Sequence, residues 1–192
     1  MPTLGLVIYL TSQWPAVIFM PVQLKWLIIF GALILTCLVP LFIILWMLRS
    51  GSISTLMMED KSERFTPLFI SCLSIITFYF FIKKFEHLQG IGLVLIFAIC
   101  SFISVLSALF VTRFWKISLH AIGVGGLLAF ATVLWWFFDA ISIPVLAITF
   151  LIAGITGSAR LYLGVHTKFQ VWIGYLVGIL PQALVVWWLF KF

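Results

Sequence analysis

The sequence predicts an all-α protein, a polytopic bundle of transmembrane helices, and two observations lead to this prediction. The chain has 192 residues, of which 65% are hydrophobic and only 8% are charged, whereas a soluble domain is usually about 45–50% apolar. Its apolar residues also form long runs instead of alternating with polar ones, which argues against the strands of a membrane barrel. The net charge of +6 is scattered between these runs, and this argues against nucleic acid as a partner.

Six apolar runs reach the roughly 17–25 residues that a transmembrane helix needs. They cover about residues 26–48, 66–82, 90–112, 120–138, 140–157 and 171–190. A seventh run at 4–22 is interrupted by Gln13, Pro15 and Pro21, so we expect either an additional N-terminal span or a helix lying along the membrane interface. This run lacks the basic start and cleavage site of a signal peptide, and we expect it to be retained.

The rest of the chain offers no sign of a second domain or a metal centre. No linker or internal repeat divides it, so we expect residues 1–192 to form a single membrane domain. Its three cysteines, Cys37, Cys72 and Cys100, all lie inside apolar runs without the spacing of metal ligands. We therefore interpret them as buried apolar side chains.

Alternation of the spans divides the connecting segments between two sides of the membrane. Segments 49–65, 113–120 and 158–170 follow alternate runs and share one side, here called face one, and the linkers near 23–25, 83–89 and 139 share the opposite side, face two. Face one receives seven of the eleven Lys and Arg residues and two of the three His residues. Because ionisable residues near membrane depth are costly, this cluster indicates a functional site. For Arg49, Arg113 and Lys168, a simpler interpretation is that they extend to the lipid headgroups.

Segment 158–170 has the most informative spacing on face one. Arg160 and His166 are six residues apart, and Gln170 follows His166 by four. If the last helix begins here, His166 and Gln170 share a face and can form a hydrogen bond. Further along, Gly174 and Gly178 have the spacing of a helix contact.

Two other blocks contribute residues of the same kinds. Ser118 and His120 open the run at 120–138, and the small residues that follow permit close helix packing, namely Gly123, Gly125 and Gly126. The segment at the start of the run at 66–82 contains Lys61, Arg64 and Pro67.

Taken together, these three blocks resemble the signature motifs of the type 2 phosphatidic acid phosphatase (PAP2) superfamily of membrane lipid phosphatases, as a divergent member. The family motifs read K-x6-R-P, P-S-G-H and S-R-x5-H-x3-D, in this order and on one side of a helical bundle. Arg160 and His166 keep the third spacing, while Ala159 replaces the family Ser and Gln170 replaces the Asp.

The other two motifs match less closely. Ser118 and His120 match the second, in which Ile117 and Leu119 replace Pro and Gly. The first motif is represented by the right residue types at shortened spacing, Lys61, Arg64 and Pro67. The resemblance covers about residues 49–192.

The resemblance implies a metal-independent hydrolase that removes phosphate from a phosphomonoester or diphosphate lipid through a phosphohistidine intermediate, without a cofactor. His166 would be the nucleophile, His120 the general acid, and Gln170 would orient the ring of His166. The phosphate would be bound by four side chains, Lys61, Arg64, Ser118 and Arg160.

The resemblance also implies a bacterial inner membrane and a site on the extracytoplasmic side. Once Lys61, Arg64 and Arg160 are set aside, four Lys or Arg residues remain on each face, so the positive-inside rule chooses neither orientation. Suitable substrates include undecaprenyl diphosphate, phosphatidylglycerophosphate, phosphatidic acid and lipid A phosphate, which the sequence does not rank.

Three alternatives stay open at this point. The chain could bind or transport lipid phosphates without hydrolysing them, with Gln170 only marking the interface end of the last helix. His120 and His166 could instead ligate haem or a metal, although this would leave the spacing of Arg160 without a purpose. Finally, the prolines inside the spans could indicate a transporter with broken helices, namely Pro40, Pro144 and Pro181.

Overall fold

The apolar runs become long helices that pack side by side. The computed structural model of the chain describes residues 1–53, 55 and 62–190. Within these ranges, six helical segments are long and apolar enough to cross a membrane. They are α3 (Val22–Leu33) continuing through η1 (Ile34–Leu38) into α4 (Val39–Arg49), then α5 (Phe65–Lys83), α6 (Ile91–Phe114), α7 (Leu119–Trp136), α8 (Ile143–Tyr162) and α9 (Lys168–Phe190). The predicted all-α polytopic bundle is confirmed.

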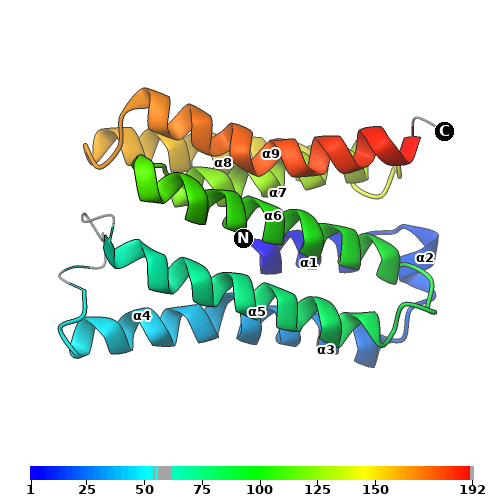
Figure 1. Cartoon of the computed structure of the whole chain (residues 1–192). Coiled ribbons are helices and arrows are strands. Elements are labelled where there is room, and N and C mark those ends of the chain that lie inside the picture. The colour runs from blue at the N-terminus through cyan, green and yellow to red at the C-terminus, as the bar shows by residue number, and fades with distance from the viewer. Residues whose placement is uncertain (54, 56–61, 191–192) are drawn as a thin grey trace.

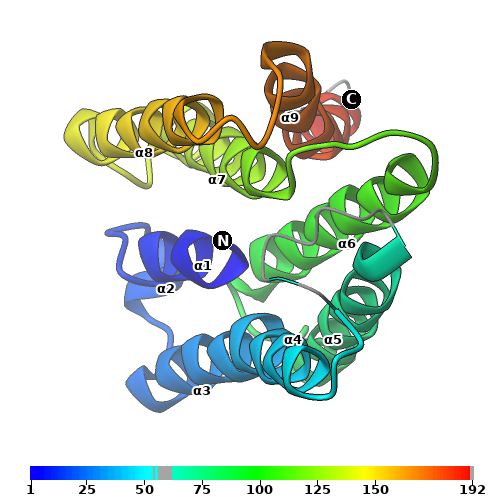
Figure 2. The ribbon, with the colours of Figure 1, turned by 90° about the vertical axis from the view of Figure 1, so that its left-hand side faces the viewer.

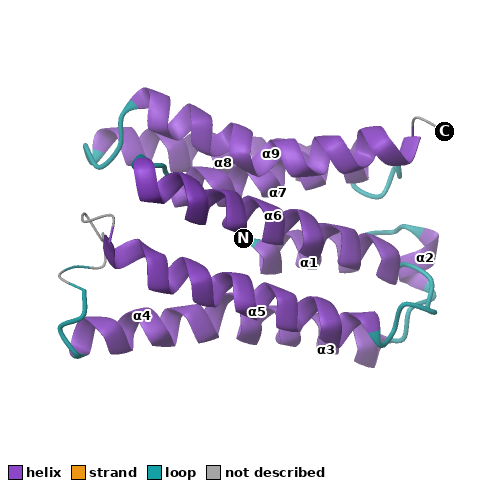
Figure 3. Cartoon of the chain, viewed as in Figure 1, coloured by secondary structure: helices purple, strands orange, loops and turns teal. Residues whose placement is uncertain are grey.

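The connections lie at the two ends of the bundle, as the alternation of spans predicts (Figure 1, Figure 3). The left-hand end in Figure 1 is face one, where α4 ends, α5 begins, and the α6–α7 and α8–α9 connections turn. Seen from this end, α7, α8 and α9 form one side of the molecule and α3, α4 and α5 the other, with α1 and α6 between them (Figure 2). The three blocks singled out in the sequence therefore meet at one end.

The N-terminal run forms a buried half-length helix. α1 (Pro2–Leu10) is followed by a single turn, α2 (Pro15–Ile18). At 1.5 Å per residue, α1 is only about 14 Å long, whereas a span must cross about 30 Å. Leu6 and Tyr9 are fully buried, and the Tyr9 hydroxyl donates a hydrogen bond to the Gly90 carbonyl at 2.7 Å. The run therefore does not form one spanning helix, because it divides into α1 and α2, and α1 packs its apolar face inside the bundle.

Two prolines interrupt spans without ending them. Pro40 cannot donate to the preceding turn, and a π-helical turn, η1, accommodates it. Pro181 likewise leaves the Val177 carbonyl of α9 without its helical donor. The hydroxyl of Ser104 on α6 lies 3.3 Å from that carbonyl and 3.0 Å from the Cys100 carbonyl of its own helix, so its one hydrogen is shared between them. The Cys100 thiol of α6 donates to the Pro181 carbonyl at 3.6 Å. The proline in α9 is thus supported by side chains of α6.

Glycines bring α7 and α9 into backbone contact. A Cβ atom at Gly178 would collide with the Ile122 carbonyl and would lie 2.7 Å from the Gly126 nitrogen. A Cβ atom at Gly174 would lie 2.9 Å from the Ser118 carbonyl. The predicted helix contact is confirmed, and it holds the face-one ends of α7 and α9 together.

The cysteine prediction is confirmed for two of the three side chains. Cys72 and Cys100 are buried, but Cys37 is exposed. Cys37 lies in η1, in the span formed by α3, η1 and α4. This span and α8 are the two least buried of the six, and Cys37 is on the side of its span that faces away from the bundle.

Candidate functional site

The turn between α8 and α9 places Arg160 and His166 at the same end of the bundle. Arg160 is in the last turn of α8, and Gly164, with φ of +65°, reverses the chain just after the helix ends. A left-handed residue at this position is tolerated best by glycine. His166 follows the turn directly, two residues before α9 begins. The six-residue spacing therefore spans one helix end and one tight turn.

Gln170 has two roles at the start of α9. Its backbone N–H donates to Thr167 Oγ1 at 3.4 Å, and its side-chain Oε1 accepts from the Thr167 backbone N–H at 3.1 Å. This reciprocal pair is a capping box of the type Thr-x-x-Gln. The same Oε1 lies 3.1 Å from His166 Nδ1, so the predicted His166–Gln170 hydrogen bond is confirmed. His166 forms this hydrogen bond from a position two residues before α9 begins, and not from the first turn of the helix as the sequence suggested.

The capping box also determines the tautomer of His166. A backbone N–H can only donate, so the Gln170 atom that faces Thr167 must be the amide oxygen. That oxygen can only accept from the imidazole, which requires the hydrogen of the neutral ring to be on Nδ1. Nε2 consequently keeps its lone pair. A neutral glutamine thus supplies the orientation that a carboxylate would supply, without its charge.

Cations from three separate segments act electrostatically on His166. Burial lowers the pKa of His166, the hydrogen bond with Gln170 opposes this change, and the charges of Lys116, Arg64 and Arg160 lower the pKa further. The net result is a pKa below the usual histidine value, so the ring is neutral at pH 7. Arg160 also acts electrostatically on His120 at the start of α7 and is therefore the common neighbour of both histidines.

Both described arginines of this cluster, Arg64 and Arg160, are at least partly buried. Arg64 ends η2 (Ser62–Arg64), the short helix before α5, and is only 4% exposed. Arg160 is half-buried, and among the described residues its Nε has no hydrogen-bond partner. A buried donor left unsatisfied costs about 1–3 kcal/mol, which an anionic ligand at this position would offset. Lys61, also predicted to bind phosphate, lies outside the described residues.

Ser118 has a structural role that the sequence prediction did not include. It is 0% exposed and caps α7, its Oγ accepting from the Ala121 N–H at 3.4 Å. Its own backbone N–H donates to the Gln170 carbonyl at 3.4 Å, which links the starts of α7 and α9. In this cap the Ser118 oxygen only accepts, and its hydrogen can still be donated, so phosphate binding by Ser118 stays a prediction. Its backbone and side chain also position the starts of α7 and α9.

Lys116 is the cation that the motif comparison passed over. It lies two residues before Ser118 in the same block, but it matches no position of the family motif. Its neighbour Trp115 packs edge to face against Phe169 of α9, with ring centroids 5.4 Å apart, and this contact holds the α6–α7 connection beside His166. In contrast, Arg49, Arg113 and Lys168 are exposed, as expected for side chains that reach the headgroups.

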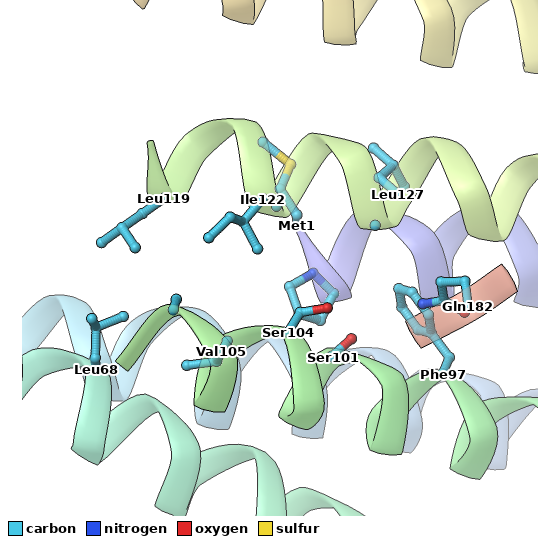
Figure 4. Close-up of a pocket in the computed structure, with 14 residues that line it drawn as sticks. Met1, Leu68, Phe97, Ser101, Ser104, Val105, Leu119, Ile122, Leu127 and Gln182 are labelled. Carbon is cyan, nitrogen blue, oxygen red and sulfur yellow. The ribbon is translucent and has the colours of Figure 1, made fainter. Parts of the chain in front are cut away.

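A small cavity lies inside the bundle below the cations, between α6 and α7 (Figure 4). Its volume is about 100 Å³. Leu68 and Leu119 line the end toward face one, while Ser101, Ser104 and Gln182 line the deeper part. The cavity is therefore apolar near the site and polar at its floor.

Comparisons of the chain with models of protein families, with curated proteins and with solved structures found no match.

Proposed function

We propose that this chain is an integral membrane lipid phosphatase, which transfers the phosphoryl group of a phosphomonoester or diphosphate lipid to His166 and then to water. One observation carries the proposal. A neutral imidazole with a defined tautomer lies on one face of a membrane bundle, and the charges of three cations from three different segments act on its pKa. Phosphoryl transfer needs this combination of a positioned nucleophile and fixed positive charge.

The chemistry follows from the assigned side chains. Nε2 of His166 attacks phosphorus, and an N–P bond forms as the P–O bond to the lipid breaks. His120 gives a proton to the departing oxygen. Water then attacks the phosphohistidine, the N–P bond breaks, and His120 recovers a proton from that water. Arg64, Arg160 and Lys116 neutralise the phosphoryl oxygens, so the mechanism requires no metal or cofactor.

The neutral Gln170 supports a second candidate function. A carboxylate would stabilise the positive charge that develops on the ring during attack, and an amide provides orientation only. The same cluster would then bind a lipid phosphate without turnover. We favour hydrolysis because Gln170 leaves Nε2 unprotonated, which phosphate binding alone does not need.

The resemblance supplies the rest of the proposal. We propose from it that the protein belongs to a bacterial inner membrane, with face one on the extracytoplasmic side. Undecaprenyl diphosphate, phosphatidylglycerophosphate and phosphatidic acid are the substrates to test first.

The deciding experiment measures release of inorganic phosphate from these lipids by the purified protein in detergent with a chelator present. We expect His166→Ala to abolish release and His87→Ala, an exposed histidine on face two, to leave it unchanged. Brief incubation with a ³²P-labelled lipid followed by alkaline quenching should trap acid-labile label on the wild type only. Equal rates in wild type and His166→Ala would rule out the nucleophile. Tight binding of lipid phosphate without release would establish the non-catalytic function.

A further inference from the structure

A lateral groove lies between α8 and α9, on the outside of the bundle. Its volume is about 420 Å³, within the roughly 300–1,000 Å³ of ligand-sized pockets. Phe150, Trp172 and Ile179 provide large apolar side chains, and the α8 side is made of small residues that leave the space open, Ala153, Gly154, Gly157 and Ser158.

The face-one end of the groove lies at the α8–α9 segment that carries the candidate site. Ser158 and Lys168 line it at the face-one end, and both belong to the segment that carries Arg160 and His166. Tyr175 of α9 reaches across to α8, where its hydroxyl donates to the Ala153 carbonyl at 2.5 Å. The groove is thus a preformed apolar channel with a cation at one end, and no acidic residue is among the described side chains that line it.

The interior cavity is a poorer place for a hydrocarbon chain. Its volume is about a quarter of that of the groove, 100 Å³ against 420 Å³. This is below the roughly 300–1,000 Å³ of ligand-sized pockets. The groove has the larger volume, and it lies on the outside of the bundle, where a lipid chain can enter from the bilayer.

We propose that the α8–α9 groove binds the hydrocarbon chain of the lipid phosphate while its headgroup lies at Arg160 and His166, an inference that rests on the function proposed above. The lipid then enters sideways from the bilayer, its chain stays in an apolar environment, and Lys168 attracts the phosphate toward the site. The groove would determine which lipid chains are accepted.

Gly154→Leu tests the groove directly. Within the described part of the chain, nothing lies within 4 Å of a Cβ atom at Gly154, so the new side chain projects into open groove without disturbing the backbone. Gly92→Leu in α6 is a matched control, since Gly92 is also an exposed helical glycine with open space around it. Both changes replace Gly by a better helix former.

We expect Gly154→Leu to lower kcat/KM for a long-chain lipid phosphate by about tenfold or more, the usual effect of a methylene-sized misfit in an apolar pocket. Hydrolysis of a short-chain, water-soluble ester with the same headgroup should not change, and Gly92→Leu should behave as wild type with both. An equal loss of activity on both substrates would overturn the groove assignment.

A binding measurement separates this inference from the proposed hydrolysis. A lipid phosphate with a photoreactive diazirine in its chain should label peptides of α8 and α9, and excess lipid phosphate should displace the label while the corresponding lipid alcohol should not. Labelling spread over all exposed helices, or equal displacement by the alcohol, would refute the groove. Specific labelling without phosphate release by any lipid would support the groove and refute the hydrolysis.

Discussion

Replacing Gln170 by Glu tests the central hydrogen bond of the candidate site. The two side chains have the same length, so Glu keeps an oxygen acceptor beside His166 Nδ1 and adds a full negative charge. An opposite charge within about 4–6 Å shifts a pKa by roughly 1–3 units. Because His166 is only half-buried, solvent screening places the expectation at the lower end, about one unit, or about 1.4 kcal/mol. The direction is upward, opposing the burial and cations that lower the pKa in the wild type.

The assay is a histidine NMR titration of the labelled protein in micelles. The chain has three histidines, so each resonance can be assigned by single substitutions. If His166 must be neutral to react, the acid limb of the phosphate-release profile should move to higher pH by the same amount. Glu also preserves the capping box and suits a helix N-terminus by about 0.3–1 kcal/mol, so the thermal midpoint should not fall.

The control is Gln89→Glu, which adds the same charge to an exposed position on face two. It should leave the titration of His166 unchanged. If Gln170→Glu also leaves the titration unchanged, or lowers the pKa, then Oε1 does not lie beside Nδ1 and the derivation of the tautomer is refuted.

Three further predictions concern the surroundings of the site. Lys116→Ala should raise the pKa of His166 and reduce kcat/KM for phosphate release by roughly tenfold to a hundredfold, the value of a hydrogen bond to a charged group; the exposed Arg113→Ala should do neither in the same NMR and rate measurements. Gly178→Ala should reduce the free energy of unfolding by about 1–3 kcal/mol, because its Cβ would enter the backbone of α7. Gly154→Ala, which has free space, should not reduce it, and thermal unfolding in detergent compares the two. Ser104→Ala should cost about 0.5–1.5 kcal/mol in that assay by removing a donor that the α9 carbonyl freed by proline shares with the Cys100 carbonyl, and an unchanged midpoint would contradict this role.

The spans and their sidedness were predictable because each depends on a local property of the chain. The length of an apolar run determines whether a helix can cross the bilayer, and alternation then assigns every connection to a face. The fate of residues 4–22 was not predictable in this way. A broken run can span, lie flat or pack inside, and the outcome depends on whether other helices leave room, which only the packed bundle shows.

The candidate site was partly predictable for similar reasons. The spacing of Arg160, His166 and Gln170 indicated which residues would meet, and the structure brings them together. The role of Ser118 depended on how closely α7 approaches α9, a distance set by glycines more than fifty residues further along the chain. Lys116 matched no motif, yet it acts on His166, because electrostatic neighbours are selected by space and not by sequence order.

The shared oxygen of Gln170 has a consequence for how the histidine responds to solvent. An amide oxygen has two lone pairs, and here the Thr167 N–H and the His166 ring engage both. Water at the site therefore finds no free lone pair on this oxygen. If the Gln170 amide flipped, its NH₂ group would face the Thr167 N–H, and two donors would oppose each other. The proton on Nδ1 therefore stays in place whether the site is filled with water, with lipid or with product, and the reactive nitrogen is available before any ligand arrives.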